Sequence, residues 1–294
     1  MTPHSGRTGP RRLAGLLAAG LVLALAPALA PGAPPAVAGD GTSDRDVEVV
    51  SGEDGTWSIE THGAPERAWH ERRKVGESVD GRTIWAYHLG EPSDVPKAGI
   101  KRVVLIATMH GDEQQSRVPL LAMKEGPALV GADVWLVPTY NPDGLAAGTR
   151  KNARGVDLNR NYPNSWADLD GNYESGSGPA SEPETQAVMA FLREVRPHRI
   201  LSFHQPLHGV DTDTKDSAWA RHVATTLKLP TKTFDCGGVC HGTMTGWYNN
   251  RFDGSALTVE FGAKPGQKYL RETVPPRIRR VFGLRPGYYE WGVD

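Results

Sequence analysis

The sequence predicts an α/β fold: one three-layer α/β/α domain in which helices cover both faces of a mixed, mostly parallel central sheet. Short apolar runs bounded by turn residues alternate with segments of helical periodicity from about residue 83 onward. The run at 101–108 is almost entirely apolar, which is typical of a central strand covered on both faces. Polar residues follow several runs directly, at the sheet edge where α/β proteins gather ligands.

The individual elements follow from local patterns. Alternation over residues 83–89 predicts a strand at the start of the sheet. Further strands are predicted over 101–108, 133–138, 199–203 and 256–261, with a turn at 141–144. Helices are predicted over 113–124, 217–227 and 275–282.

A long segment, residues 145–180, is rich in glycine, asparagine and charge and lacks apolar periodicity. We interpret it as a surface excursion, and such long loops in compact domains are usually functional or disordered. After it, Ser181 is expected to cap a helix while Glu184 reaches back in a capping box. The apolar positions of this helix that are expected to face the sheet are Val188, Met189, Phe191 and Leu192.

The first 38 residues resemble an export signal. Arg7, Arg11 and Arg12 form a basic start, residues 13–30 are apolar, and small residues precede a predicted cleavage after Ala38. An uncleaved membrane anchor is the alternative. We therefore expect a secreted protein with no stable membrane association after cleavage, and the paired arginines leave general and twin-arginine export both open.

In the remaining chain, residues 39–70 are expected to be an N-terminal extension, and residues 71–294 are expected to be one catalytic domain. Loss of the three leader arginines leaves 30 basic against 34 acidic residues, a balance that argues against a nucleic-acid partner. Cys236 and Cys240, in an exported chain, favour a short disulfide over two free thiols. A structural zinc site with His241 is the third alternative.

A group of ionisable residues sits where predicted strands end. His110 and Glu113 lie in the stretch ATMHGDEQQS, directly after the apolar run at 101–108, and His204 follows the strand at 199–203. Two imidazoles and one carboxylate, with a fourth position left to water, are typical of a hydrolytic rather than a structural zinc site. The alternative for each residue is an ordinary polar side chain where a strand reaches the surface.

The excursion also contains groups that bind anions. The string TRKNARGVDLNRNYP supplies the guanidinium groups of Arg150, Arg154 and Arg160 and the amide of Asn159. Planar guanidinium groups suit carboxylates and developing oxyanions, because they donate two parallel hydrogen bonds.

These motifs occur in a characteristic order. HGDE, NPDG, RKNARGVDLNRNYP, SEPET, SFHQ and TVEFG together resemble the zinc carboxypeptidases related to carboxypeptidase A. The resemblance runs from about residue 75 to the end, and the ordered set is specific although each motif alone is weak. It implies one Zn²⁺ per chain, held by His110, Glu113 and His204 at the carboxyl ends of the strands. It also implies that Glu260 is the general base, which takes a proton from the zinc-activated water and returns it to the leaving amine.

The same resemblance implies roles for individual residues of the excursion. Arg150, rather than Arg154, matches the arginine that polarises the scissile carbonyl. Asn159 and Arg160 match the pair that binds the terminal carboxylate of the substrate. Asp157 matches the carboxylate that orients the first zinc-ligand histidine.

The glycine–tryptophan pattern CHGTMTGWYNNRFDGSALTVEFG is similar to the compact murein peptide amidases of this family, which cut between γ-D-glutamate and diaminopimelate in cell-wall peptides. By this resemblance, Trp247 or Tyr248 is expected to lie over the substrate, and packing of the pair beneath the loop is the alternative. Only residues 39 to about 70 precede the catalytic pattern, so a folded inhibitory prodomain is not expected.

Together these features predict a secreted zinc metallocarboxypeptidase of the bacterial cell-wall environment. Its substrate is expected to be a peptide with a free C-terminal carboxylate, with peptidoglycan-derived peptides as the leading class. A zinc-dependent N-acyl amino acid deacylase is one alternative, because such enzymes share HxxE, DLNR and a later histidine. A catalytically inactive wall-binding module is the other, although the ligands and Glu260 are all retained. The C-terminal residue preference and the oligomeric state stay open.

Overall fold

The computed structural model describes residues 47–51, 57–61, 68–91, 101–234, 236 and 240–287. The predicted signal peptide, residues 1–38, lies outside the described residues. The chain divides into two units, residues 1–62 and residues 63–294. Within the first unit, β1 (Val47–Ser51) and β2 (Trp57–Thr61) form an antiparallel pair. None of the helices in the described part of the chain is long and apolar enough to cross a membrane.

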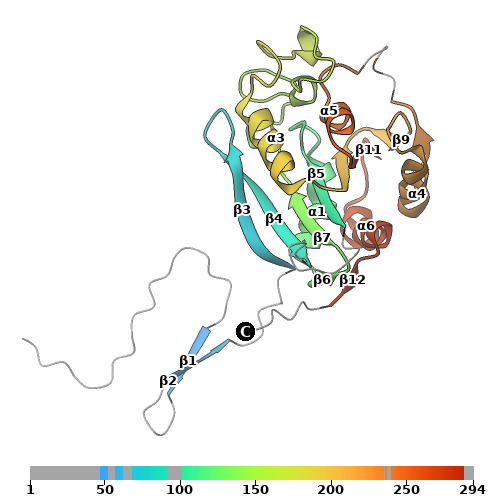
Figure 1. Cartoon of the computed structure of the whole chain (residues 1–294). Coiled ribbons are helices and arrows are strands. Elements are labelled where there is room, and N and C mark those ends of the chain that lie inside the picture. Colours follow the sequence, from blue (N-terminus) through green and yellow to red (C-terminus); the bar gives the residue numbers. More distant parts are fainter. Residues whose placement is uncertain are drawn as a thin grey trace, which may run out of the picture. The chain divides into compact units, whose positions relative to one another are not determined.

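An eight-stranded mixed sheet forms the centre of the second unit (Figure 1). Its strand order is β10-β9-β11-β8-β5-β7-β4-β3. The strands are β3 (Trp69–Glu77), β4 (Thr83–Gly90), β5 (Arg102–Ala107), β7 (Asp133–Val137), β8 (Arg199–His204), β9 (Leu207–Asp211), β10 (Thr231–Lys232) and β11 (Ser255–Gly262). The middle four, β11, β8, β5 and β7, run parallel, and antiparallel pairs flank them. A separate antiparallel pair joins β6 (Leu129–Val130) to β12 (Arg285–Pro286).

Helices cover both faces of this sheet. The α-helices are α1 (Val118–Lys124), α2 (Pro142–Ala147), α3 (Pro183–Val195), α4 (Ser217–Leu227), α5 (Met244–Arg251) and α6 (Val274–Phe282). Shorter turns are η1 (Gln114–Arg117), η2 (Leu158–Arg160), η3 (Gly171–Tyr173) and η4 (Tyr269–Thr273). In Figure 1, α3 and α5 lie on one side of the sheet and α1, α4 and α6 on the other. The predicted three-layer α/β fold is confirmed.

The alternation of side chains along β5 builds both layers of core. Val103 and Leu105 pack with α1, α4 and α6, while Val104 and Ile106 point to the opposite face and pack with α3 and α5. All four are fully buried, and burial of such a side chain contributes about 1.5–3 kcal/mol. Because both faces are covered, ligands can approach this sheet at its strand ends.

The predicted capping box at the start of α3 is wrong. The cap residue is Glu182, and the hydroxyl of Ser181 donates to the Glu182 side chain, 2.8 Å away. Glu184 is buried and accepts hydrogen bonds from the backbone N–H of Val79 at 3.1 Å and the amide of Asn152 at 3.2 Å. The carboxylate therefore joins the β3–β4 turn to the excursion and does not reach back to Ser181.

The helix predicted over 113–124 is split into η1 and α1. The hydroxyl of Ser116 donates to the carbonyl of Glu113 at 2.7 Å and accepts from the backbone N–H of Thr108 at 3.2 Å. Such local side-chain bonds compete with the regular helical ladder, so the first turn is a tighter 3-10 turn. Glu113 consequently precedes the helix and stands at its sheet-edge end.

Candidate active site at the carboxyl edge of the sheet

Three parallel strands bring the candidate residues to one edge. Glu260 on β11 lies directly opposite His204 on β8 in the strand register. Ala107, the last residue of β5, lies opposite Phe203, the neighbour of His204. The loop that leaves β5 therefore emerges beside the end of β8, with His110 three positions beyond the strand. Residues far apart in sequence meet because parallel strands share their carboxyl edge.

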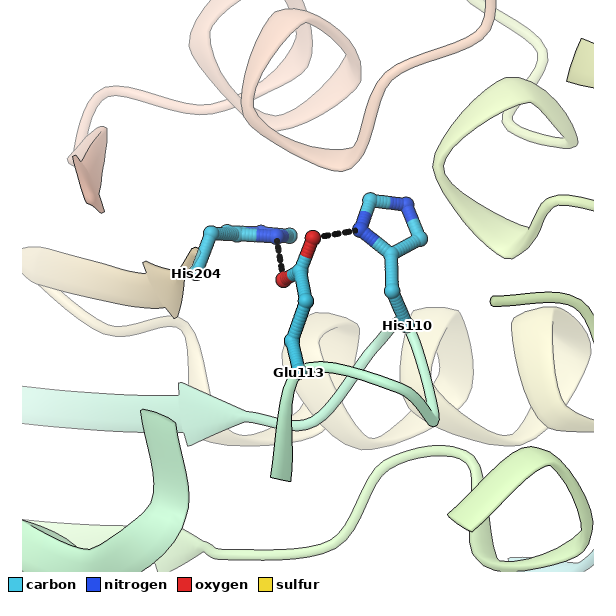
Figure 2. Close-up of side chains that lie close together, drawn as sticks. All are labelled: His110, Glu113 and His204. Atoms are coloured by element: carbon cyan, nitrogen blue, oxygen red, sulfur yellow. Dashed lines mark hydrogen bonds and ion pairs between the residues drawn. The ribbon is translucent and has the colours of Figure 1, made fainter. Parts of the chain in front are cut away.

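His110, Glu113 and His204 form a compact cluster (Figure 2). Nδ1 of His110 lies 2.8 Å from Oε1 of Glu113, and Nδ1 of His204 lies 2.9 Å from Oε2. All three side chains are buried, and one ligand atom from each lies within 4.8 Å of the others. Within the described residues, no other group of three or more histidine, cysteine or acidic side chains meets this criterion. The two nitrogens and one carboxylate fit the donor set of catalytic zinc.

The far side of each imidazole is also held. Nε2 of His110 lies 2.9 Å from Oδ1 of Asp157, the carboxylate that the resemblance assigns to this place. Nε2 of His204 lies 2.9 Å from the hydroxyl of Ser202, a residue that our sequence reasoning missed. The available signal was the two-residue period of β8, which puts Ser202 and His204 on the same face. With both Nε2 atoms engaged, the two Nδ1 atoms are left facing Glu113.

The charges of the cluster reinforce one another. Burial alone would lower the pKa of His110, but the carboxylates of Asp157 and Glu113 outweigh burial and raise this pKa to about 9. Burial would raise the pKa of Glu113, yet the two imidazoles lower it to about 2. Glu113 is therefore ionised throughout the neutral range, as a carboxylate ligand of a metal must be.

A close backbone approach fixes the loop that carries His110. A Cβ atom on Gly111 would overlap the carbonyl carbon of Gly144, so no larger residue fits without a shift of the backbone. The N–H of Gly111 donates to the carbonyl of Arg150 at 3.2 Å. The loop that carries His110 is thereby joined both to α2 and to the segment that carries the arginines.

The structure separates the two arginines that the sequence offered. Nε and Nη2 of Arg150 donate to Oδ2 of Asp157 at 2.9 and 2.7 Å, and Nη1 lies 3.7 Å from Oε1 of Glu113. Arg154 is exposed and lies 3.7 Å from Glu182, outside the lining of the site cavity. Burial would lower the pKa of Arg150, but the charge of Asp157 outweighs it and raises the pKa. A charged guanidinium thus stands beside the cluster.

Arg160 and Asn159 form the neighbouring wall. The Nη1 group of Arg160 donates to the carbonyl of Asn159 at 2.7 Å, and Nη2 lies 4.0 Å from Sγ of Cys236. Cys236 and Cys240 form a disulfide. The side-chain oxygen of Asn159 accepts from the backbone N–H of Met244 at 3.1 Å. Arg160 forms no ion pair within 4 Å among the described residues, so this largely buried cation has no carboxylate partner there.

A cavity of about 810 Å³ connects these groups. Its lining includes the three cluster residues, Arg150, Asn159, Arg160 and Glu260. Glu260 is buried, and its Oε2 accepts a hydrogen bond from the backbone N–H of Leu207 at 3.1 Å. Burial raises the pKa of Glu260 above its ordinary value. The arrangement combines a candidate metal site, a candidate base and two arginines in one cleft.

Trp247 and Tyr248 do not line this cavity. Both are buried on α5, where Trp247 packs against Tyr162 at 5.4 Å between ring centroids and Tyr248 donates to the carbonyl of Pro197 at 2.6 Å. The expected position over the substrate is therefore not observed, and the packing alternative describes the pair. Tyr173 and Phe234 are the phenyl-type side chains that line the cavity, and Tyr173 is the exposed one. Sequence reasoning missed Tyr173 because the excursion has no periodic pattern.

Comparisons with known proteins point to one family. The zinc carboxypeptidase family pattern matches residues 68–212. Murein peptide amidase A of Escherichia coli (strain K12) is 33% identical over 195 residues, which are 60% of this chain and 78% of that protein. Carboxypeptidase M of Mus musculus is 28% identical over 140 residues, which are 40% of this chain and 30% of that protein.

Solved structures show the same similarity. The murein-tripeptide amidase MpaA from Escherichia coli O157 has a TM-score of 0.59 at 25% identity, covering 74% of this chain and 94% of that chain. Carboxypeptidase A from Helicoverpa armigera has a TM-score of 0.60 at 14% identity, covering 74% of this chain and 68% of that chain. At that low identity the second similarity concerns the fold alone.

Proposed function

Because this chain belongs to the zinc carboxypeptidase family, we propose that it is a secreted metallocarboxypeptidase that hydrolyses the bond next to a free terminal carboxylate. The observation that carries this proposal is the shared cavity. It places a His/Glu/His cluster, a buried carboxylate and an arginine without a carboxylate partner among the described residues around one space.

The cluster residues have the chemistry that a zinc ion requires. The family uses Zn²⁺, and His110, Glu113 and His204 would hold it through two nitrogens and a carboxylate oxygen. When bound, zinc is a Lewis acid that lowers the pKa of a water molecule from ~15.7 toward ~7. Asp157 and Ser202 then keep the imidazoles in the orientation that presents their Nδ1 atoms.

Glu260 is the proposed general base. Its carboxylate accepts the proton of the attacking water and returns it to the leaving amine. Burial raises its pKa, which makes the carboxylate a stronger base than an exposed glutamate. Arg150, held by Asp157, is the proposed donor to the oxyanion that develops on the scissile carbonyl, and loss of such a donor typically costs ~10²- to 10³-fold in rate.

Arg160 and Asn159 are the proposed carboxylate clamp. Arg160 is largely buried, and burial lowers its pKa, so the charged form gains from an anionic partner. The terminal carboxylate of a peptide supplies that anion and accepts two parallel hydrogen bonds from a guanidinium group. Binding at this point places the adjoining peptide bond toward the cluster and Glu260.

Cell-wall peptides are the proposed substrates. Similarity to murein peptide amidase A over most of that protein supports a murein tripeptide, cut between γ-D-glutamate and diaminopimelate. This substrate agrees with the proposed export to the cell-wall environment of a bacterium.

The test is a substrate panel with zinc-loaded protein. It comprises free murein tripeptide, ordinary peptides with different C-terminal amino acids, and N-acyl amino acids, each repeated after metal chelation. Release of diaminopimelate or a terminal amino acid that chelation abolishes supports the proposal. Release from N-acyl amino acids alone would indicate a deacylase, and no release from any substrate would indicate an inactive binding module.

A further inference from the structure

Tyr173 is an exposed aromatic side chain at the rim of the site. It ends η3, within the excursion, and 52% of its surface is accessible. Among the described residues, only Tyr173 and Leu207 are exposed large hydrophobic side chains, and both line the site cavity. An aromatic ring that is exposed to water lacks the stabilisation that burial of its apolar surface would give. Its position at the rim of a cleft therefore suggests that it contacts a bound ligand.

The ring contacts both cavity arginines. Cζ of Arg160 lies 4.9 Å from its centroid, and Cζ of Arg150 lies 5.6 Å from it. These distances are within the range of cation–π attraction, which strengthens when the cation is desolvated. The two like charges otherwise disfavour each other, since the charge of Arg150 contributes to lowering the pKa of Arg160. The negative ring face thus stabilises two cations that repel.

The backbone around Tyr173 is anchored to the site. The N–H of Tyr173 donates to the carbonyl of Asp170 at 3.2 Å, which closes the turn. The carbonyl of Glu174 accepts from the N–H of Asp157 at 2.7 Å. Because the side chain of Asp157 holds both Arg150 and His110, the position of the ring is tied to the same residue that orients the site.

We propose that Tyr173 is a positioning residue that holds the guanidinium group of Arg160 in its carboxylate-binding orientation and forms the aromatic wall beside the bound terminal residue. This inference rests on the proposed function, because it assumes that Arg160 binds a carboxylate. The proposal places the aromatic side chain beside the substrate in the excursion, at Tyr173, instead of on α5. The π face is the required property, and the phenolic hydroxyl is not.

The test separates the ring from the hydroxyl and from bulk. Three variants, Tyr173→Phe, Tyr173→Leu and Tyr269→Leu, are each combined with Glu260→Gln to slow turnover. Cζ of Arg277 lies 5.7 Å from the ring centroid of Tyr269, which is not part of the cavity lining. The Tyr269→Leu variant therefore controls for the loss of a tyrosine–arginine contact elsewhere in the protein. Calorimetry measures the affinity for two forms of murein tripeptide. In one form the terminal carboxylate of diaminopimelate next to the scissile bond is free, and in the other it is amidated.

We expect Tyr173→Leu to weaken binding of the acid about tenfold and binding of the amide about twofold or less. Tyr173→Phe and Tyr269→Leu should stay within about twofold of the parent on both ligands. In the otherwise unchanged enzyme, Tyr173→Leu should raise KM on the acid with kcat within about twofold. Equal affinity of the Tyr173→Leu and Tyr173→Phe proteins for the acid, or equal losses on acid and amide, would overturn the proposal. Failure of the proposed function appears separately, as absence of hydrolysis by the unchanged enzyme.

Discussion

The imidazole of His204 is held on both sides. One ring nitrogen faces Glu113 and the other faces Ser202, both at 2.9 Å, and the residue ends a fully covered strand. Neither contact can be reproduced by a neighbour, because the next side chain on the same strand points to the other face. Loss of this imidazole should therefore remove one ligand without replacement.

We predict that His204→Ala loses bound zinc, while His222→Ala, an exposed histidine on α4, retains about one zinc per chain. The reason is that three protein ligands are the usual minimum for a catalytic zinc site. Metal analysis of the purified variants measures this directly. A full complement of zinc in His204→Ala would remove the cluster as the metal site.

Glu260→Gln should keep zinc and fold but lose most turnover. The amide can still accept a hydrogen bond from the N–H of Leu207, yet it cannot take a proton from water. General bases typically contribute ~10²- to 10⁴-fold, and we expect the loss in kcat. Steady-state kinetics together with a metal assay decide the matter, and a near-normal kcat would assign the base elsewhere.

Arg160→Ala should discriminate between acid and amide substrates. A buried guanidinium loses both its charge pairing and its paired hydrogen bonds when the ligand carboxylate becomes a neutral amide. We expect a cost of ~2 to 4 kcal/mol in kcat/KM on a peptide with a free terminal carboxylate and a much smaller cost on its amide. Kinetics of both proteins on both substrates measure it. Equal costs would mean that Arg160 supports the loop instead of the ligand.

At the scale of elements, the strands were predicted well because their physical signal is strong. After one charged residue at its start, each of β5 and β7 is apolar to its end. His204 and Glu260, the two strand residues predicted beside the site, lie at the shared carboxyl edge. α4 was predicted with its observed bounds, since its apolar face is regular. Such elements are specified by burial, which the sequence encodes directly.

The elements that were missed lack that periodic signal. α5 contains a glycine and mixed polar residues, and its N-cap is Thr243, whose hydroxyl accepts from the N–H of Gly246 at 3.1 Å. β9 begins with two exposed residues, and its five residues mix apolar and polar side chains. Tyr173 stands in a turn held by contacts with distant backbone, so only the folded chain reveals its neighbours. These positions depend on tertiary structure, which local patterns do not contain.

The turn between β3 and β4 is attached to α2 by one buried carboxylate. Oδ1 of Asp143 accepts from the hydroxyl of Ser78 at 2.7 Å and from Nη1 of Arg82 at 2.6 Å, and Oδ2 accepts from the N–H of Asp80 at 3.0 Å. Burial would raise the pKa of Asp143, but these three donors outweigh it and lower the pKa below its ordinary 3.8. The ionised form is thus favoured by folding.

Asp143→Asn should therefore lower the free energy of unfolding by about 1–3 kcal/mol at pH 7. A depressed pKa contributes stability that is complete above pH 3.8 and is lost as the pH falls through the folded value. The difference between the two proteins should shrink on acidification. Urea unfolding at pH 7 and near pH 3 measures this, with Asp80→Asn, the exposed partner of Arg82, as the control with little effect. An unchanged difference at the lower pH would contradict the assignment.

At the scale of the whole molecule, the candidate metal site joins segments that are distant in the chain. Glu113 and His204 are 91 positions apart, and they belong to the loop after β5 and to the end of β8. We predict that zinc raises the melting temperature in a concentration-dependent manner. A ligand present at 100 times its dissociation constant stabilises the native state by about 2.7 kcal/mol. Thermal unfolding across a zinc series, with His204→Ala as the insensitive control, tests this, and parallel responses of the two proteins would refute it.

The pairing of the central strands also bears on when a cation can bind during folding. The cluster atoms lie together because β5, β8 and β11 pair in register, so the unfolded chain is expected to present no preformed site to a cation. We therefore expect the cation to bind after the folding transition state. An interaction formed at that stage slows unfolding more than it speeds folding. A cation held at this edge would therefore lower the unfolding rate and lengthen the lifetime of the native state. Where unfolding is followed by irreversible loss, this lifetime matters more than the equilibrium constant.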